Sequence, residues 1–112
     1  MIVSEVCQKL NLKLLAGEEG VDRDVTGLYI CDLLSWVMSH AVKGNAWITV
    51  QTHSNIIAVA TLLDMSCIII PEDIEVEEET IKKANEEQMP LLKSSQNSYD
   101  LAKEFQNSGI GK

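Results

Sequence analysis

Four consecutive polar residues, Thr52, His53, Ser54 and Asn55, stand between a short β-branched run and a strongly apolar helical segment. The imidazole of His53 can donate or accept a proton, and the Asn55 amide offers one acceptor and two donors. The hydroxyls of Thr52 and Ser54 can bond to a ligand or to the free N–H groups at the start of the helix. This junction (residues 52–55) is the candidate binding site of the sequence. The simpler interpretation is a helix cap, formed by Thr52 or Ser54, beside an exposed loop histidine.

Three carboxylates follow the apolar runs on either side of the junction. Asp32 comes after the run 25–31, and Glu72 and Asp73 come after the run 67–70. Ligands of open α/β sheets bind beyond the carboxyl ends of the strands, so we expect these side chains to flank the junction. Their charge opposes a long phosphate chain and favours a polar, zwitterionic or singly phosphorylated ligand.

The same residues define an alternative in which the protein is a small enzyme. His53 would act as general acid or base, with Asp32 or Asp73 as the carboxylate that orients it. This hypothesis requires the three side chains to converge within hydrogen-bond reach. A metal site formed by the same side chains lacks any ligand pair of diagnostic spacing, and the terminal GIGK lacks the residues of a phosphate-binding loop. We therefore assign no catalytic residue and expect no metal and no cofactor.

Strand-like and helix-like segments alternate along the whole chain and must position these residues. Strands are predicted at 12–15, 25–31, 46–50, 67–70 and 90–92, and helices at 4–10, 33–43, 55–63, 72–89 and 98–108. Connections of this length favour parallel strands with right-handed crossovers. The prediction is an α/β fold, a single three-layer domain with a mostly parallel sheet of about five strands and flanking helices. It covers residues 1–112, and the last residues, about 108–112, are expected to be flexible.

The helix that follows the junction is apolar on nearly every side. Such a helix is either sandwiched inside the domain or shared with another subunit. Trp36 and Trp47 are predicted to be core or interface anchors. We therefore expect a homodimer.

Composition narrows the possible partners and the compartment. The chain has 9 basic and 17 acidic residues, a net charge of −8, without a basic cluster that could follow a phosphate backbone. Nucleic acid is not an expected partner. No apolar run approaches the ~20 residues that span a bilayer, so no membrane contact is expected. Three widely spaced cysteines and the absence of a leader-like start predict a cytoplasmic protein with reduced thiols.

An ordered series of segments resembles the DRTGG-domain family over nearly the whole chain. The segments are VTGLYICDLLSWVM, AWITVQTHSNIIAVA, CIIIPED, TIKKANEEQMPLL and SYDLAKEF. The resemblance implies an α/β domain similar to the N-terminal, non-catalytic domain of bacterial HPr kinase/phosphatase. Related domains accompany CBS modules and some phosphotransacetylases, which implies a sensing or assembly role. Short forms like this one imply a link to anaerobic energy metabolism or hydrogenase systems.

Two departures from the family fall at the predicted site. Many members carry a Gly-Asp-Arg type sequence where this chain has Thr52, His53 and Ser54, and a Thr-Gly-Gly turn where it has Pro71, Glu72 and Asp73. Without a phosphate-binding loop the chain is not an HPr kinase by itself. The expected function is a non-catalytic regulatory or protein-interaction module, a homodimer that senses a small polar ligand at the junction.

Overall fold

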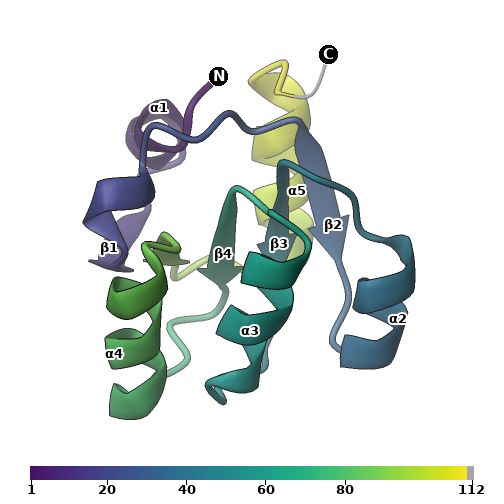
Figure 1. The fold of residues 1–112 in the computed structure, drawn as a ribbon. Coiled ribbons are helices and arrows are strands. Elements are labelled where there is room, and N and C mark those ends of the chain that lie inside the picture. The colour runs from purple at the N-terminus through teal and green to yellow at the C-terminus, as the bar shows by residue number, and fades with distance from the viewer. Residues whose placement is uncertain (111–112) are drawn as a thin grey trace.

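The computed structural model describes residues 1–110 and places a central sheet between two layers of helices (Figure 1). In chain order the elements are α1 (Val3–Lys9), β1 (Lys13–Ala16), the 3-10 helix η1 (Glu18–Gly20), β2 (Gly27–Ile30), α2 (Leu34–His40), β3 (Asn45–Ile48), α3 (Asn55–Leu62), β4 (Cys67–Ile70), α4 (Glu78–Glu87), β5 (Leu91–Lys93) and α5 (Ser98–Asn107). Residues 111 and 112 lie outside the described range, and the expected flexibility of 108–112 stays a prediction.

The five strands pair in the order β1-β5-β4-β3-β2. The pairs β2–β3, β3–β4 and β4–β5 are parallel, and only β1 runs antiparallel, with Lys13 opposite Lys93. Every residue of β3 and β4 is buried, as expected for parallel strands covered on both faces. The predicted α/β class, with a mostly parallel five-stranded sheet in three layers, is confirmed.

Alternating side chains of the central strands divide the core into two halves. Trp47, Ile68 and Ile70 pack on the face covered by α2, α3 and α4, whereas Ile48 and Ile69 pack on the face covered by α1 and α5. This alternation follows from the two-residue period of a strand. Both faces are apolar, which is why the sequence shows nearly continuous β-branched runs.

Helix α3 lies between α2 and α4 on one face of the sheet (Figure 1). On the inner side of α3, the side chains of Ile56, Ile57 and Ala60 are fully buried. Leu62, in the same helix, is 69% exposed. The sequence predicted that this helix is either sandwiched inside the domain or shared with another subunit. Its inner side is packed inside the domain. Its outer side remains in contact with solvent.

The two tryptophans have different environments. Trp47 is fully buried, and its indole N–H donates to the Cys31 carbonyl at 2.8 Å. Trp36 is 51% exposed and stacks on His40, with ring centroids 3.9 Å apart. Trp47 is thus a core residue, and Trp36 belongs to the surface.

Helix starts depart from the predictions at two places. Helix α1 begins at Val3, one residue before the predicted start, and the Glu5 carboxylate accepts from the Ile2 N–H at 2.9 Å. Helix α4 begins only at Glu78, so most of the acidic run 72–79 forms the preceding loop and not a helix N-terminus. Helix α5 begins at Ser98, as predicted, and the side chain of its cap, Asn97, accepts from the Asp100 N–H. Among the described residues, no helix is long and apolar enough to cross a membrane.

Candidate functional site

Asp32 holds together the carboxyl ends of β2 and β3. One oxygen of its carboxylate accepts from the Thr49 hydroxyl and from the Val50 N–H, both at 2.9 Å. The Gln51 side-chain amide donates to the Asp32 carbonyl at 3.0 Å. Asp32 therefore lies next to the segment that leads into the junction, as predicted, and its carboxylate already has two donors.

His53 caps helix α3. Its Nδ1 accepts from the Asn55 N–H at 3.1 Å, whereas Ser54 makes no side-chain cap bond. The prediction of Thr52 or Ser54 as the cap was wrong, because Ser54 already has helical dihedral angles (φ −61°, ψ −17°) and not the extended conformation of a capping serine. With Nδ1 accepting, a neutral His53 carries its proton on Nε2. The exposed Nε2 is the atom that a ligand would meet.

Thr52 connects the junction to the start of α4. The buried Thr80 donates its hydroxyl to the Thr52 carbonyl at 2.6 Å, and the Thr52 hydroxyl lies 3.5 Å from a carboxylate oxygen of Glu77. Glu77 is thus a site carboxylate that the sequence analysis missed. No signal separates it from its acidic neighbours, since only the packing of α4 against α3 brings it to the junction.

Glu72 and Asp73 lie at the same edge of the sheet, but their backbone N–H groups bond to the segment that follows β5. The Glu72 N–H donates to the Gln96 carbonyl and the Asp73 N–H to the Ser94 carbonyl, at 2.9 and 2.8 Å. The Asp73 carboxylate lies 3.9 Å from the Lys93 ammonium. Both residues adopt left-handed backbone conformations, with φ of 59° and 56°. A turn of this shape suits the paired glycines that many family members have here.

The predicted residues share one edge without forming a catalytic set. Among residues 1–110, no hydrogen bond joins His53 to Asp32 or Asp73, whose carboxylates have other partners. The convergence that the enzyme hypothesis requires is therefore not present. Within the same range, no group of three or more His, Cys, Asp or Glu side chains could hold a metal ion.

Two thiols, those of Cys7 and Cys67, are poorly suited to nucleophilic chemistry. Burial raises the pKa of Cys67 to about 12 and raises the pKa of Cys7 above its ordinary value. A thiol must ionise to attack an electrophile, and these two remain protonated at neutral pH.

An exposed apolar surface borders Asp32 at the free edge of the sheet. Ile30, Leu33, Trp36 and Val50 are 46, 63, 51 and 44% exposed, and we call these four residues the β2–α2 surface. Leu33 and Trp36 are one helical turn apart, and Val50 is bonded to Asp32 through its N–H. Tyr29 and Cys31 pack on the face of the sheet that α2 covers, so by the two-residue period of a strand Ile30 faces the α5 side, whereas Trp36 belongs to α2.

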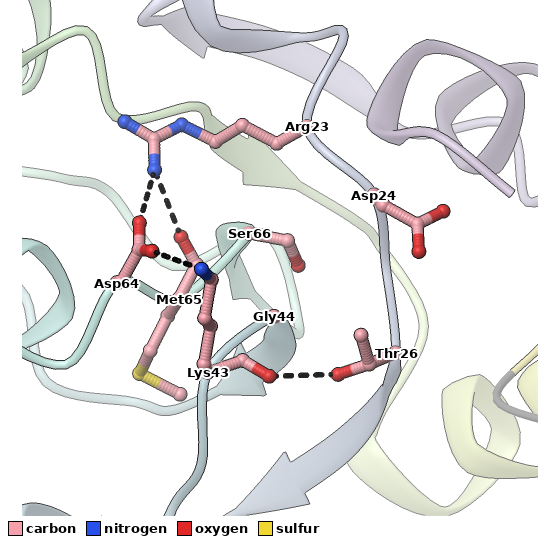
Figure 2. A pocket seen from close by; sticks show the side chains of 8 residues that line it. All are labelled: Arg23, Asp24, Thr26, Lys43, Gly44, Asp64, Met65 and Ser66. Carbon is pink, nitrogen blue, oxygen red and sulfur yellow. Dashed lines mark hydrogen bonds and ion pairs between the residues drawn. The ribbon is translucent and has the colours of Figure 1, made fainter.

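A cavity of about 380 Å³ lies at the opposite end of the same strands (Figure 2). Thr26, Gly44 and Ser66, which directly precede β2, β3 and β4, line it. The remaining lining residues are Arg23, Asp24, Lys43, Asp64 and Met65. Residue patterns do not identify this cavity, because its lining comes from segments that are distant in the sequence. A usable signal was present in Arg23, the only arginine of the chain.

Comparison with known proteins gives one family and one fold. A family model of the DRTGG domain matches residues 5–108. The structure is similar to the crystal structure of the CBS and DRTGG domains of the regulatory region of Clostridium perfringens pyrophosphatase, complexed with the activator diadenosine tetraphosphate. The TM-score is 0.69 at 13% identity, over 91% of this chain and 44% of that chain, so this chain spans less than half of its length. No curated protein sequence matches the chain significantly.

Proposed function

The chain belongs to the DRTGG domain family, and from this membership we propose that it is a non-catalytic regulatory module. In this proposal it dimerises through the β2–α2 surface and binds a small polar ligand at the junction. The regulatory region of the clostridial pyrophosphatase, part of which has the same fold as this chain, supports the regulatory role. Occupation of the junction would then alter the stability of the dimer.

One observation carries the proposal, namely the position of Asp32 between the polar edge and the apolar surface. Asp32 stands between the exposed Ile30 and Leu33, and its carboxylate fixes the backbone of Val50. A ligand that pulled on the segment 49–51 would therefore change the shape of the β2–α2 surface. This contact provides a physical route from ligand binding to association.

Charge distribution favours a second copy of the chain as the occupant of the β2–α2 surface. Residues 25–63, which build β2, α2, β3 and α3 at one side of the molecule, contain a single carboxylate, Asp32. The other 16 acidic residues lie outside this segment. Two copies with a net charge of −8 repel each other least when these sides face one another.

The free groups of the junction favour a ligand of low charge. His53 Nε2 and the side chains of Ser54 and Asn55 are available to donate or accept hydrogen bonds, and the carboxylates of Asp32 and Glu77 are close by. The clostridial region was solved with a dinucleoside polyphosphate. At this junction the nearby carboxylates disfavour such a polyanion, and a neutral or zwitterionic ligand suits them better.

Light scattering coupled to size-exclusion chromatography tests the dimer. Wild-type protein should have twice the mass of the 12.4 kDa chain, and Leu33→Glu should have the mass of a monomer because it places a charge in the interface. Leu62→Glu is the matched control, since Leu62 is exposed to a similar extent but lies at the far end of α3. A monomeric wild type, or equal effects of the two variants, would overturn this half of the proposal.

Thermal denaturation tests the ligand site. Wild-type protein is screened against nucleotides, acyl phosphates and amino acids, because a ligand that binds only the native state raises the Tm by mass action. A compound that shifts the wild type should lose its effect with His53→Ala and keep it with His40→Ala. A shift that survives in His53→Ala places the site elsewhere, and a screen without any shift counts against ligand sensing.

A further inference from the structure

We propose that the cavity at the amino-terminal ends of β2, β3 and β4 is a second ligand site, which holds one small oxyanion group between Arg23 and Lys43. The group is a carboxylate or a single phosphate, and the rest of the ligand lies in the cavity of about 380 Å³. Nothing in this proposal depends on dimerisation or on the junction at the opposite end of the sheet.

The first argument is an excess of positive charge at the cavity. Arg23 Nη1 lies 3.3 Å from one oxygen of the Asp64 carboxylate, and the Lys43 ammonium lies 3.5 Å from the other (Figure 2). Two cations thus share one carboxylate. The Asp24 carboxylate points away from them in Figure 2 and pairs with the N-terminal ammonium at 3.2 Å. One positive charge is left for a ligand in a chain whose net charge is −8.

The second argument is the geometry of the ion pairs. Charge-assisted N–H···O bonds normally measure about 2.7–2.9 Å, and both contacts to Asp64 are longer. Arg23 Nη1 divides its contacts between Asp64 and the Met65 carbonyl, also at 3.3 Å. The Lys43 side chain is 83% exposed and keeps donors free. The Asp64 carboxylate therefore leaves donors of Arg23 and Lys43 free for an oxyanion that lies beside it.

The third argument is that the cavity wall is held in place before any ligand binds. Gly44 donates its N–H to the Asp64 carbonyl at 3.0 Å and accepts from the Thr26 N–H at 2.9 Å, which ties the three loops together. Ser66 is only 1% exposed, and its hydroxyl has a weak partner, the Cys67 sulfur at 3.9 Å. Ser66 lines the cavity and adds a neutral hydroxyl to its wall. A site that needs no ordering on binding loses less affinity to entropy.

Titration with inorganic phosphate and, separately, with acetate tests the proposal, with amide NMR shifts as the readout. The Gly44 and Ser66 amides should shift saturably in the wild type. Arg23→Gln should weaken binding about tenfold and Lys43→Gln about threefold, as expected for a half-buried and an exposed charge. Lys82→Gln, an exposed lysine on α4, is the control and should leave the affinity unchanged. The probe that binds with the higher affinity, phosphate or acetate, identifies which oxyanion the site prefers.

Asp64→Asn provides the decisive variant. Removing the carboxylate that competes for Arg23 and Lys43 should raise the affinity for the oxyanion severalfold. The variant should fold, because Asp64 has a φ of 56° and asparagine tolerates the left-handed conformation well. The proposal would be overturned if Asp64→Asn bound the oxyanion more weakly than the wild type, or if Lys82→Gln lost as much affinity as Arg23→Gln. It would also be overturned if neither the wild type nor Asp64→Asn showed a saturable shift. His53→Ala should bind phosphate as the wild type does, so failure here is separable from failure at the junction.

Discussion

At the scale of single residues, the polar side chains at the edge of the sheet hold the backbone in place as much as they offer a site. Asp32 accepts hydrogen bonds at the end of β3, and His53 caps α3. The Thr52 carbonyl accepts a hydrogen bond from the hydroxyl of the buried Thr80. Each was expected for its chemistry, and each has a structural partner within a few residues or in the next element. A ligand at this edge must therefore use the atoms that these bonds leave free, above all His53 Nε2.

The backbone of Glu72 adopts a conformation that is unfavourable for a residue with a side chain. Its φ of 59° lies in the left-handed region, where a Cβ costs about 1 kcal/mol and glycine pays no such cost. We expect Glu72→Gly to raise the free energy of unfolding by roughly 0.5–1 kcal/mol in urea denaturation. Lys82→Gly, at an exposed position in the middle of α4, should lower it by a similar amount. A loss of stability in both variants would contradict this account.

Cys67 makes stability depend on pH in the alkaline range. Its thiol would ionise near pH 9.0 when unfolded and only near 12 when folded, so the unfolded chain releases a proton that the native chain keeps. The stabilisation is complete below pH 9.0 and is lost as the pH rises toward 12. Urea denaturation should show a decline that is steeper in the wild type than in Cys67→Ala by about 1.4 kcal/mol per pH unit. Parallel curves for Cys67→Ala and wild type would refute the assignment.

At the scale of elements, α3 shows what periodicity cannot decide. Its sequence is apolar on nearly every side, so the face that packs on the sheet is visible only once α2 and α4 are placed beside it. Ile57 is fully buried and Leu62 is largely exposed, although both belong to the same apolar run.

This difference predicts unequal effects of two similar truncations. Ile57→Ala should lower the free energy of unfolding by about 2–5 kcal/mol, because it leaves a cavity between α3 and the sheet. Leu62→Ala should change it by less than about 0.5 kcal/mol. Chemical denaturation of both variants measures the difference, and comparable losses would mean that Leu62 is buried in an assembly.

At the scale of the whole molecule, charge is distributed unevenly. Residues 25–63, which build the β2 edge of the sheet and its helices α2 and α3, contain one carboxylate and one lysine, so the rest of the chain carries the net charge of −8. Helix α5, which contacts β2, carries Asp100 and Glu104. Such a molecule can self-associate through one side while remaining repulsive on the others.

Salt should therefore act in opposite directions on the two proposed interactions. Raising NaCl from about 20 to about 500 mM screens repulsion between two acidic copies and should tighten the dimer in sedimentation equilibrium. The same change should weaken phosphate binding at Arg23 and Lys43, because it screens an attraction. A dimer that dissociates with salt would show that attractive charge pairs, and not the β2–α2 surface, hold it together.

Much of the fold could be predicted from residue patterns, and the candidate site only in part. The strand 67–70 and the start of α3 at Asn55 match the structure because β-branched runs and junctions are local features. Glu77 joins the junction, and Arg23 reaches the loop before β4, only through contacts between distant segments. The similarity to HPr kinase/phosphatase, the cytoplasmic location, the homodimer and the ligand stay predictions.

The sequence by itself determined the order of the five strands and five α-helices along the chain, the α/β class and the family, because each depends on patterns that recur within a few residues. Tertiary structure alone decided the strand order, the antiparallel β1 and the outward side of α3. It also decided that Asp32 and His53 have separate partners, and that Arg23 and Lys43 meet at one carboxylate. The physical reason is that hydrogen bonds and ion pairs act over a few ångströms in space, and separation along the chain does not reveal which side chains come that close.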